Sequence, residues 1–596
     1  MAVADIHTSN KLLVVSIDFG TTYSGYAFSF KAEYEQNRMK IFTKHWKPDG
    51  YAKTPTVLLL DSQQRFLAFG FDAENKYAEL ADDNAHNGYY YFHHFKMTLH
   101  ANTKLSRKED IEDCQGKHVR ASVVFMHSIR YLKEMAEKDL KNRGIPIIEN
   151  EIRWILTVPA IWNDAAKQFM REAAADAGIA QNVLRLALEP ESASIYCKEL
   201  IVNREEGSQS SELAALREGS KFMVVDMGGG TVDVTVRQVV EGRKLKELHV
   251  ATGGPWGGWK VNENFMVFMG NLLGQEVWDK FCSEYMSDKL EIERDFEKKK
   301  RYIELGSDNR ILIKLPLAVR EVFKELTKKD LNNVIAIERG FQGKVEMKKD
   351  KLKLDPKLVQ SFFDDSLKSI LNHLQNVLKS IDIDTLFLVG GFAESPLVCE
   401  TIQQTFPEKR IVFHDDAGLC VLKGAVLYGH DPSIVTARVC KLTYGTEAMR
   451  YFIEGYDPEY QKVTVDGQPF CKIFVKHAEI GQTVSIEETS TCELEAISAT
   501  MTVMTIPVFF SEEQNPVYTS DPSCQLLGKV KVDITDLSGG INRKVIVNFT
   551  FGESELMVEA VNAQSGDKVY AAFDLLDDKG QENINRDNVY EEGIPS

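Results

Sequence analysis

The sequence contains no long apolar run and no leader-like segment. No stretch approaches the roughly 20 apolar residues that a membrane helix needs, and the first residues, MAVADIHTSN, lack a basic region followed by an apolar run. The last residues, EEGIPS, form neither a prenylation box nor a retention signal. We therefore expect no membrane span and a cytoplasmic location, with the nucleus as a second compartment.

Cysteine and positive charge are scarce. The nine cysteines form no Cys-x-x-Cys pair, which argues against a zinc site or a disulfide framework and favours reduced thiols. Lys plus Arg number 71 against 88 Asp plus Glu, a formal charge of −17. Because a nucleic-acid surface needs a basic face, we expect no nucleic-acid partner. His93 and His94 fit a surface strand better than a metal pair, since successive strand residues face opposite ways.

Two common signatures of nucleotide enzymes are absent as well. The P-loop pattern G-x-x-x-x-G-K-[ST] does not occur, because no Gly–Lys pair is followed by Ser or Thr; these pairs begin at Gly116, Gly343 and Gly528. The HRD…DFG set of protein kinases does not appear either. The sequence thus excludes both classes.

The remaining composition is that of a soluble globular chain. Apolar residues make up 43% and charged residues 27% of 596 residues, a length that accommodates several domains at roughly 100–200 residues each. Up to about residue 430, apolar runs typical of buried strands alternate with helical patterns, which is an α/β signature. The runs are Val14–Ile17, Ile155–Val158, Met223–Val225 and Leu386–Val389.

Helix signals lie between these runs. Asn163 can cap a helix that ends at Gly178. Pro356 opens a second predicted helix, whose apolar positions are Leu358, Phe362, Leu367 and Leu371.

The pattern changes in the last part of the chain. From Lys441 to Leu576 apolar residues alternate by two, and Asp466–Gly467 is a strong hairpin signal. A second turn is predicted at Ser565–Gly566–Asp567. This part is therefore predicted to be a β-meander of sandwich or barrel type, followed by a loose polar tail.

One chemistry-bearing pattern occurs twice. The segments VVSIDFGTTYSGYAFSF, from Val14, and FMVVDMGGGTVDVTVRQVV, from Phe222, each place an Asp at the end of an apolar strand, then a turn with glycine and hydroxyl residues, then a second strand. Glycines allow consecutive N–H groups to converge on an anion. The recurrence predicts two related lobes that face each other.

The two carboxylates in this pattern point to a metal ion. Asp18 and Asp226 would repel a phosphate directly, but they make chemical sense if Mg²⁺ stands between, because Mg²⁺ prefers oxygen ligands. A single Asp-x-Gly turn is usually a plain hairpin; two copies on buried strands favour a nucleotide site. The sequence therefore predicts Mg-ATP clamped between two hairpins.

The hairpins resemble the phosphate loops of the actin-like ATPase superfamily, and further segments resemble those of the seventy-kilodalton heat-shock proteins. These are VPAIWNDAAKQFMREAAADAGI from Val158, LALEPESASIY from Leu186, ERDFEKKKR from Glu293 and LFLVGGFAESPLV from Leu386. The resemblance covers nearly the whole chain and is closest to the divergent branch numbered twelve.

The resemblance implies an α/β fold with a second, β-rich part. Residues 11–432 would form a two-lobed actin-like ATPase domain, which is a duplicated ribonuclease H-like fold. Residues 433–577 would form a β-sandwich-like domain that binds substrate or partner, and residues 578–596 the polar tail.

The resemblance also implies roles for single residues. Asp18, Asp226 and Asp233 would organise Mg²⁺ and its waters. The catalytic residues, which would position the attacking water or stabilise the γ-phosphate, would be Lys96, Glu189, Asp226 and Thr231. ATP or ADP would be held by Gly20, Thr21, Thr22, Tyr23, Gly228, Gly229, Gly230, Glu297, Lys300, Arg301, Gly390, Gly391 and Phe392. Without the family, Lys96 and the charged face around Glu297 read as solvated charges.

Several segments depart from the family pattern. The junction HDPSIVTARVCKLTYGT, from His430, replaces an acidic, leucine-rich linker. GGPWGGWK, from Gly253, replaces an acidic loop, and Glu394 stands where the family has an Arg. No long helical lid is expected after the β-part. Because of these departures, the sequence predicts ATP hydrolysis less firmly than ATP binding.

Two functions from different classes follow. The first is an ATP-binding, slowly hydrolysing chaperone whose nucleotide state biases polypeptide binding by the β domain, with co-chaperones as further partners. The second is a nucleotide-gated adaptor that binds a specific protein partner with little or no hydrolysis. A sugar or acetate kinase is a weaker third, since no domain is spare for a small acceptor. The enzyme class stays open, with a weak Mg-dependent ATPase as the expectation.

Overall fold

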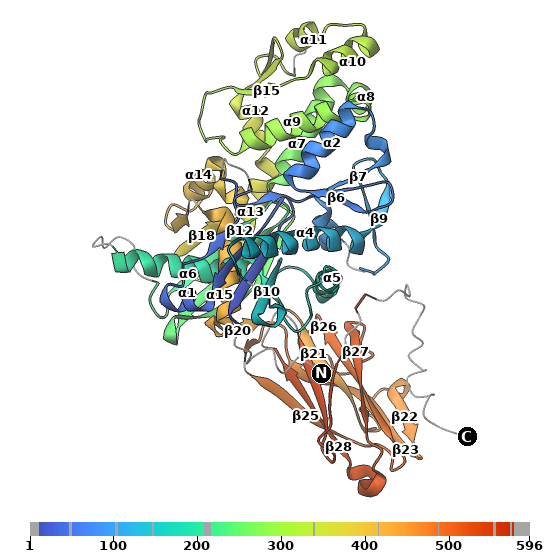
Figure 1. Ribbon diagram of the computed structural model, residues 1–596. Helices are drawn as coiled ribbons and strands as arrows, with labels where there is room; N and C mark the ends of the chain where they lie inside the picture. The colour runs from blue at the N-terminus through green and yellow to red at the C-terminus, as the bar shows by residue number, and fades with distance from the viewer. Residues whose placement is uncertain are drawn as a thin grey trace. The chain divides into compact units, whose positions relative to one another are not determined.

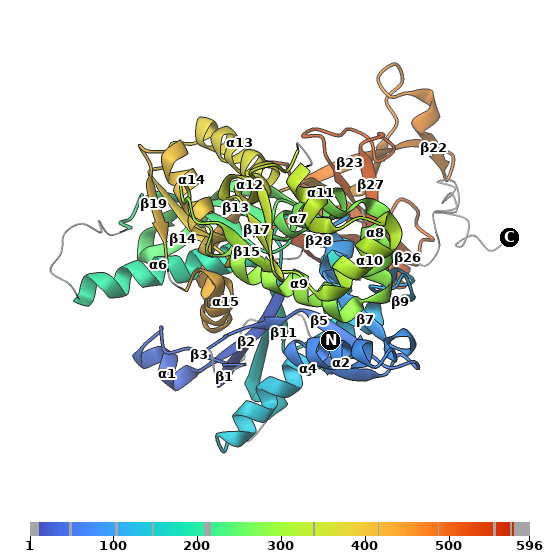
Figure 2. The same ribbon diagram turned by 90° about the horizontal axis from the view of Figure 1, so that it is seen from above.

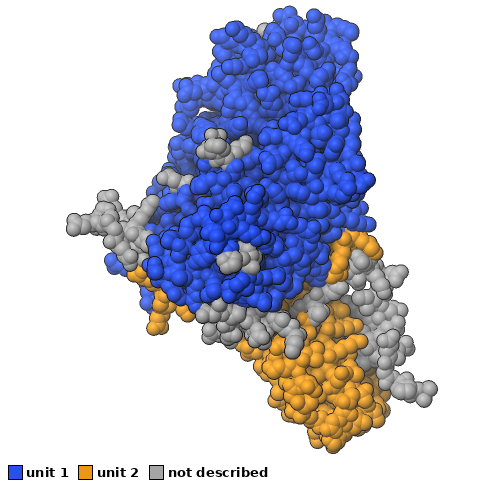
Figure 3. All heavy atoms as spheres, viewed as in Figure 1, with its two compact units in different colours: residues 1–103, 109–237, 251–432 blue, residues 104–108, 238–250, 433–596 orange. Residues whose placement is uncertain are grey.

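The computed structural model divides into two compact units, drawn in blue and orange in Figure 3. Unit 1 comprises residues 1–103, 109–237 and 251–432, and unit 2 comprises residues 104–108, 238–250 and 433–596. Within them the structure describes residues 11–46, 50–101, 105–145, 148–207, 216–337, 340–414, 416–486, 488–551, 556–571 and 575–576. The predicted tail at 578–596 lies outside the described residues.

Unit 1 is built on two sheets with matching strand order. The first has the order β11-β10-β1-β2-β3, with β4 paired to β2, and the second contains the order β19-β18-β12-β13-β14. The first sheet consists of β11 (Leu184–Leu188), β10 (Ile152–Val158), β1 (Leu13–Phe19), β2 (Tyr23–Phe30), β3 (Phe42–Thr43) and β4 (Thr54–Pro55). The second consists of β19 (Arg410–Phe413), β18 (Thr385–Val389), β12 (Lys221–Met227), β13 (Val232–Val240) and β14 (Lys244–Gly254). Residues 238–250, the end of β13 and most of β14, belong to unit 2.

The pairing shows that the two sheets are duplicates. β1 pairs parallel with β10 and antiparallel with β2, and β12 pairs parallel with β18 and precedes β13, its neighbour on the other side. The two repeated sequence segments thus occupy equivalent strands. All four predicted apolar runs are strands, which confirms the α/β prediction for this part of the chain.

Two helices lie between the sheets (Figure 2). α15 (Cys420–His430) packs against α6 (Glu189–Gly207) and β1, and α6 packs against β12. The approach is close: a Cβ on Gly424 would lie 1.7 Å from the carbonyl oxygen of Ser192, and one on Gly429 would lie 2.4 Å from Cγ1 of Val14. Glycine is therefore required at both positions of α15.

The outer part of unit 1 contains two further three-stranded sheets. They have the orders β6-β5-β7 and β15-β17-β16. Their strands are β5 (Val57–Leu60), β6 (Phe66–Phe69), β7 (Tyr90–His93), β15 (Ile311–Lys314), β16 (Val345–Lys348) and β17 (Lys351–Leu354). α2 (Phe71–Asp82) packs against α9 (Met286–Lys300), both labelled near the top of Figure 1. Their shared apolar cluster includes Ala73, Tyr77, Met286 and Leu290.

One helix prediction is confirmed and one needs correction. α5 spans Asp164–Asp176, and the Asn163 side chain accepts a hydrogen bond of 2.9 Å from the N–H of Ala166. The helix predicted from Pro356 is instead two helices, α12 (Pro356–Ser361) and α13 (Asp364–Ser380). Phe362 and Phe363 between them are both buried; adjacent residues of a continuous helix point roughly 100° apart, so a break lets each ring find its own cluster.

Unit 2 is a β-sandwich. One sheet has the order β22-β23-β21-β26-β27 and the other the order β25-β28-β29-β30. The strands are β21 (Thr443–Tyr451), β22 (Lys462–Val465), β23 (Gln468–Ala478), β25 (Thr489–Glu495), β26 (Val503–Ser511), β27 (Cys524–Asp533), β28 (Lys544–Thr550), β29 (Met557–Asn562) and β30 (Lys568–Tyr570). The predicted turn at Asp466 and Gly467 joins β22 and β23, with φ of +50° and +77°.

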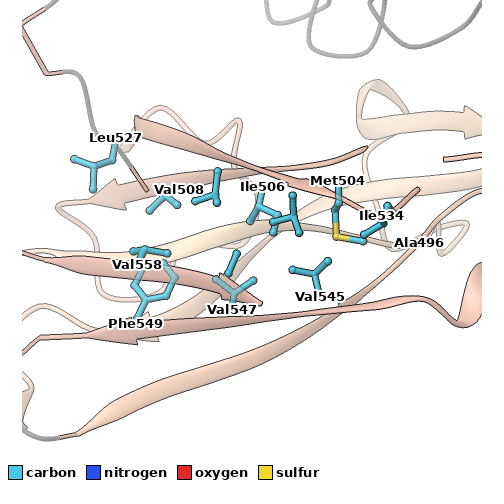
Figure 4. Packing of buried hydrophobic residues seen from close by; sticks show 13 residues of the cluster. Ala496, Met504, Ile506, Val508, Leu527, Ile534, Val545, Val547, Phe549 and Val558 are labelled. Carbon is cyan, nitrogen blue, oxygen red and sulfur yellow. The ribbon is translucent and has the colours of Figure 1, made fainter. Parts of the chain in front are cut away.

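The core of the sandwich is apolar. Alternate residues of β26 and β28 face inward because strand side chains alternate between the two faces. Figure 4 shows the two inward rows pointing toward each other, with Met504, Ile506 and Val508 from one sheet and Val545, Val547 and Phe549 from the other. The predicted β-sandwich is confirmed, but the strand order is not a simple meander, because β21 lies between β23 and β26 and β25 pairs with β28.

The junction segment is itself a strand. β20 (Val435–Val439) pairs parallel with β14, with Val435 opposite Leu245, and antiparallel with β24 (Thr483–Ser485). The Thr436 hydroxyl also donates to the carbonyl of Leu245 at 3.2 Å. Among the described residues, no helix has both the length and the apolar character needed to cross a membrane.

Candidate functional site

The first glycine hairpin connects β1 to β2 and begins just after Asp18. It is held from outside by Thr56, whose N–H donates to the carbonyl of Thr22 and whose hydroxyl donates to the carbonyl of Gly20, both at 2.8 Å. A Cβ on Gly20 would lie 2.2 Å from the carbonyl oxygen of Tyr23. The turn is therefore too tight for a larger residue.

The second hairpin connects β12 to β13 and is held by the loop that follows β14. The N–H groups of Gly257, Gly258 and Trp259 donate to the carbonyls of Gly230, Gly228 and Gly229, at 3.1, 3.1 and 2.7 Å. The backbone of the segment GGPWGGWK thus holds all three glycines of the hairpin in place. Thr231 closes the turn, since its carbonyl accepts from the N–H of Gly228 at 2.9 Å.

The two hairpins meet. A Cβ on Gly229 would lie 2.2 Å from Oγ1 of Thr22, and a Cβ on Gly230 would lie 2.6 Å from Oγ1 of Thr21. Both glycines are therefore needed for the two lobes of unit 1 to approach so closely. The hydroxyls of the first hairpin and the backbone of the second share one small volume.

Four carboxylates surround this contact. Asp18 lies at the end of β1, Asp226 in β12 and Asp233 in β13, and all three are buried. Glu189 lies where β11 passes into α6, and its Oε1 is 2.7 Å from Nζ of Lys96. Lys96 is buried in a short 3-10 helix, Phe95–Met97, and its ammonium lies 5.2 Å from the ring centre of Trp162.

The carboxylates repel one another. Burial raises the pKa of Asp226 well above its ordinary value, and the charges of Glu189, Asp233 and Asp18 add to that rise. Burial likewise raises the pKa of Glu189 to about 7, although Lys96 acts in the opposite direction. The cluster carries more negative charge than its neighbouring lysines neutralise, so it favours a cation.

The donor set fits Mg²⁺ held together with a phosphate. The available ligands are all oxygens, as Mg²⁺ prefers, and Mg²⁺ usually takes only one or two carboxylates plus waters and phosphate oxygens. Among the described residues no group of three His, Cys, Asp or Glu side chains forms a complete metal cage. If Mg²⁺ binds here, Asp18, Asp226 and Asp233 are the side chains that would hold it, and the ion would neutralise phosphate charge.

The charged face of α9 forms a network on the other side of the second hairpin. The ammonium of Lys300 donates to the carbonyl of Gly258 and to Oδ1 of Asn262, both at 2.8 Å, and lies 2.6 Å from Oε2 of Glu297. Three acceptors therefore use its three N–H donors. Lys300 positions Glu297 and the loop at Gly258.

Arg301 joins this network to the first hairpin. Its guanidinium lies 5.0 Å from the ring centre of Tyr23 and 3.1 Å from Oε1 of Glu297. It also lies 3.9 Å from Oε2 of Glu394. Glu394, which stands where the family has an Arg, is thus paired with Arg301 at the predicted adenine position.

The loop after β18 approaches the carboxylates. Gly390 has φ of +88°, and a Cβ there would lie 2.4 Å from the carbonyl oxygen of Met227 and 2.6 Å from Oδ1 of Asp226. A Cβ on the next residue, Gly391, would have no heavy atom within 4 Å apart from its chain neighbours. The ring of Phe392 is buried and lies 6.0 Å from that of Phe363. All the residues predicted for the site thus line one continuous region of unit 1.

Sequence reasoning missed two features of this region. Nζ of Lys53 lies 2.6 Å from Oδ2 of Asp18, and no motif around Lys53 indicated a site. His94 was expected at the surface, but it is half-buried with its ring 3.5 Å from that of Trp259. The aromatic residues in GGPWGGWK were the available signal for that contact.

Comparisons with known proteins agree with this geometry. A family profile described as "Hsp70 protein" matches residues 14–491. The chain is 33% identical to heat shock 70 kDa protein 12A of Homo sapiens over 95% of its length and 92% of that protein. It is 30% identical to heat shock 70 kDa protein 12B of Homo sapiens, over 95% and 91%. It is 27% identical to the chaperone protein DnaK of Thermotoga petrophila, over 58% and 53%.

Proposed function

The chain belongs to the Hsp70 family, whose members bind ATP, and we propose that it is a slowly hydrolysing, chaperone-like ATPase. Its nucleotide state would bias polypeptide binding by unit 2. The observation that carries this proposal is the contact between the two glycine hairpins, Gly229 against Thr22, inside a ring of carboxylates. A single metal-bound triphosphate can be reached there by both lobes.

Each group in the site has a proposed role. The hairpins at 20–23 and 228–231 hold the β- and γ-phosphates, and Asp18, Asp226 and Asp233 organise Mg²⁺ and its waters. Lys96 and Glu189 position the attacking water. Glu297, Lys300 and Arg301 would flank the adenosine, and the loop at 390–392 would lie beside its adenine and ribose. In such phosphoryl transfer the protein contributes positioning and charge neutralisation rather than covalent chemistry.

ATP acts in this proposal as a conformational ligand. A nucleotide held by both hairpins would bind a closed arrangement better than an open one, and only such differential binding can shift an equilibrium. The proposed domain limits, 11–432 and 433–577, place that equilibrium in the nucleotide-binding domain.

An exposed apolar loop in unit 2 supports polypeptide binding. Between β21 and β22, the side chains of Ile453, Tyr456 and Tyr460 are 51%, 69% and 80% exposed. The loop is ordered by the guanidinium of Arg450, which donates to Oδ2 of Asp457 at 2.7 Å. A fixed loop with exposed aromatic residues is a typical contact surface for an extended chain.

The junction favours a second candidate, the adaptor with little or no hydrolysis. β20 is paired on both sides, with β14 and β24, so the segment after His430 is not a free linker. A strand that stays paired on both sides in every nucleotide state cannot itself be the switch between those states. In either case we propose a cytoplasmic protein whose partners are polypeptides and co-chaperones.

One experiment separates the candidates. Calorimetry with ATP and ADP in excess Mg²⁺ measures binding, and phosphate release by the same sample measures turnover with and without a panel of apolar peptides. Turnover stimulated by unrelated peptides supports the chaperone. Binding without turnover supports the adaptor, and absence of binding contradicts both.

We predict that Asp226→Ala weakens Mg-ATP binding or hydrolysis by on the order of 10²-fold, because it removes a preorganised charge from the site. The same calorimetric and turnover measurements test this. Asp295→Ala, a carboxylate on the outer part of α9 that pairs with Lys299, is the control. A variant indistinguishable from the parent would remove Asp226 from the site.

A further inference from the structure

Lys53 places a positive charge directly on Asp18. Its ammonium lies 2.6 Å from Oδ2 of Asp18, while Oδ1 of the same carboxylate accepts from the Thr157 hydroxyl at 3.0 Å. Both oxygens of Asp18 are therefore engaged. The Lys53 side chain is 20% exposed and that of Asp18 only 6%, so solvent screens this pair weakly.

The position of Lys53 relative to the first hairpin is fixed by the backbone. It directly precedes β4, in which Thr54 pairs with Ser24 and Pro55 with Tyr23. Thr56, just beyond β4, donates to the hairpin carbonyls as described above. Alongside, a Cβ on Gly25 would lie 3.0 Å from Cγ of Lys53. The lysine is thus built into the same rigid piece as the hairpin.

The charge of Lys53 also acts across to the other lobe. Burial raises the pKa of Asp226 and of Glu394, and the Lys53 ammonium opposes the rise at both. These two residues lie in β12 and in the loop after β18, on the side of the second hairpin. Through its contact with Asp18, Lys53 lies beside the first hairpin, which the second hairpin approaches at Gly229 and Gly230.

A lysine in this place can substitute for part of the charge of a metal ion. An ammonium carries three N–H donors, so one that donates to a carboxylate can also donate to a phosphate oxygen. It is a permanent component of the site, whereas Mg²⁺ must be recruited from solution. A bound phosphate thus meets a cation even before a metal ion arrives.

We propose that Lys53 is a phosphate-binding residue whose fixed positive charge lets ADP and ATP bind with a reduced requirement for Mg²⁺. The proposal rests on the proposed nucleotide-binding function, and it assigns to this site a cation that belongs to the chain itself. Asp18 holds that cation in place when no nucleotide is bound.

The test is calorimetric titration of the full chain with ADP, once in excess Mg²⁺ and once in EDTA. For the parent protein, the Kd in EDTA should exceed that in Mg²⁺ by about tenfold or less. In Lys53→Met, the ratio of the two Kd values should grow by a further factor of about ten or more, the size expected for a lost charge-assisted hydrogen bond. Lys53→Arg, which keeps the charge, should stay closer to the parent.

Lys44→Met is the matched control. Lys44 is 24% exposed and pairs with Asp139 at 3.0 Å, and Asp139 retains the hydroxyl of Tyr26 as a partner. The control should therefore keep the parental ratio.

Two results would overturn the role of Lys53. One is an unchanged ratio in a Lys53→Met variant that binds ADP in Mg²⁺; the other, which needs no variant to fold, is a loss of about a hundredfold or more in the parent on removing Mg²⁺. Failure of the parent to bind ADP even in Mg²⁺ would instead overturn the proposed function, and this inference with it.

Discussion

One deeply buried cation of unit 2, the guanidinium of Arg543, is stabilised by backbone carbonyls. In unit 2, Arg543 is 1% exposed and donates to the carbonyls of Gly540 at 2.7 Å and Ile534 at 2.6 Å. Its Nη2 also donates to the carbonyls of Ser498 and Ala499, both at 3.1 Å. A buried charge without such partners would be strongly destabilising, so Arg543 fixes three chain segments at one end of the sandwich.

A buried histidine makes the stability of the sandwich depend on pH. The ring of His477 lies 3.9 Å from that of Phe549, and its Nδ1 is 3.0 Å from the hydroxyl of Ser490. Burial lowers the pKa of His477 from 6.5 to about 4. Below pH 6.5 the unfolded chain takes up a proton that the folded chain refuses, so stability falls as the pH drops from 6.5 toward 4.

We predict that His477→Gln reduces this loss by roughly 2 kcal/mol at pH 5, measured as the free energy of unfolding at pH 7 and pH 5. His430, whose pKa burial also lowers to about 4, retains its own share in the variant. The matched control is His118→Gln, because the His118 side chain is 57% exposed. Equal pH dependence in all three proteins would show that His477 is not the group responsible.

At the scale of elements, the α2–α9 contact closes the outer part of unit 1. Leu290 and Met286 of α9 share one apolar cluster with Ala73 and Tyr77 of α2. The guanidinium of Arg294 also lies 3.4 Å from Glu74. Since α9 also carries Glu297 and Lys300, separating it from α2 would disturb the proposed nucleotide site.

We predict that Leu290→Ala speeds ADP release by roughly thirtyfold, because a truncated buried leucine costs about 2 kcal/mol or more. Stopped-flow displacement of a fluorescent ADP analogue measures the rate. Leu374→Ala is the control, since Leu374 is also buried but lies in α13; it should lower stability without changing release. Equal release rates in both variants would count against the contact as a closing element.

The predicted and observed helices after β17 show where local pattern fails. The apolar spacing from Pro356 onward fits one helix, yet α12 ends before Phe362. That ring lies 5.4 Å from Phe268, whereas the next ring, Phe363, lies 6.0 Å from Phe392. Two adjacent aromatic residues that belong to different clusters favour a break over a continuous helix.

At the scale of the whole molecule, unit 1 is two copies of one sheet joined by helices α6 and α15. The glycine hairpin of each copy lies next to the hairpin of the other copy. The helices α15 and α6 pack so closely that a Cβ on Gly424 would lie 1.7 Å from the carbonyl oxygen of Ser192. A ligand gripped by both hairpins would favour the closed arrangement.

We therefore predict that ATP with Mg²⁺ makes the full chain more compact, with a smaller radius of gyration in X-ray scattering. Asp226→Ala should show little change at the same nucleotide concentration, because it binds ATP more weakly. Identical scattering of the parent with and without saturating ATP would contradict closure of the lobes.

The sequence alone determined the four apolar strands of unit 1, the two glycine hairpins and the alternating β pattern of unit 2. These features depend on residues close together in the chain: apolar runs, turn residues such as Asp466–Gly467, and a cap such as Asn163. Local conformational preference and side-chain periodicity encode them directly. The family resemblance then indicated which residues gather at one site.

Tertiary structure decided which charges meet. Lys53 and Asp18 are separated by 35 residues, Lys96 and Glu189 by 93, and neither pair leaves a local pattern. The three glycine carbonyls of the second hairpin likewise accept hydrogen bonds from the N–H groups of the distant residues 257–259. Such contacts depend on how whole elements pack, because a side chain's partner is set by the position of its strand or helix in space.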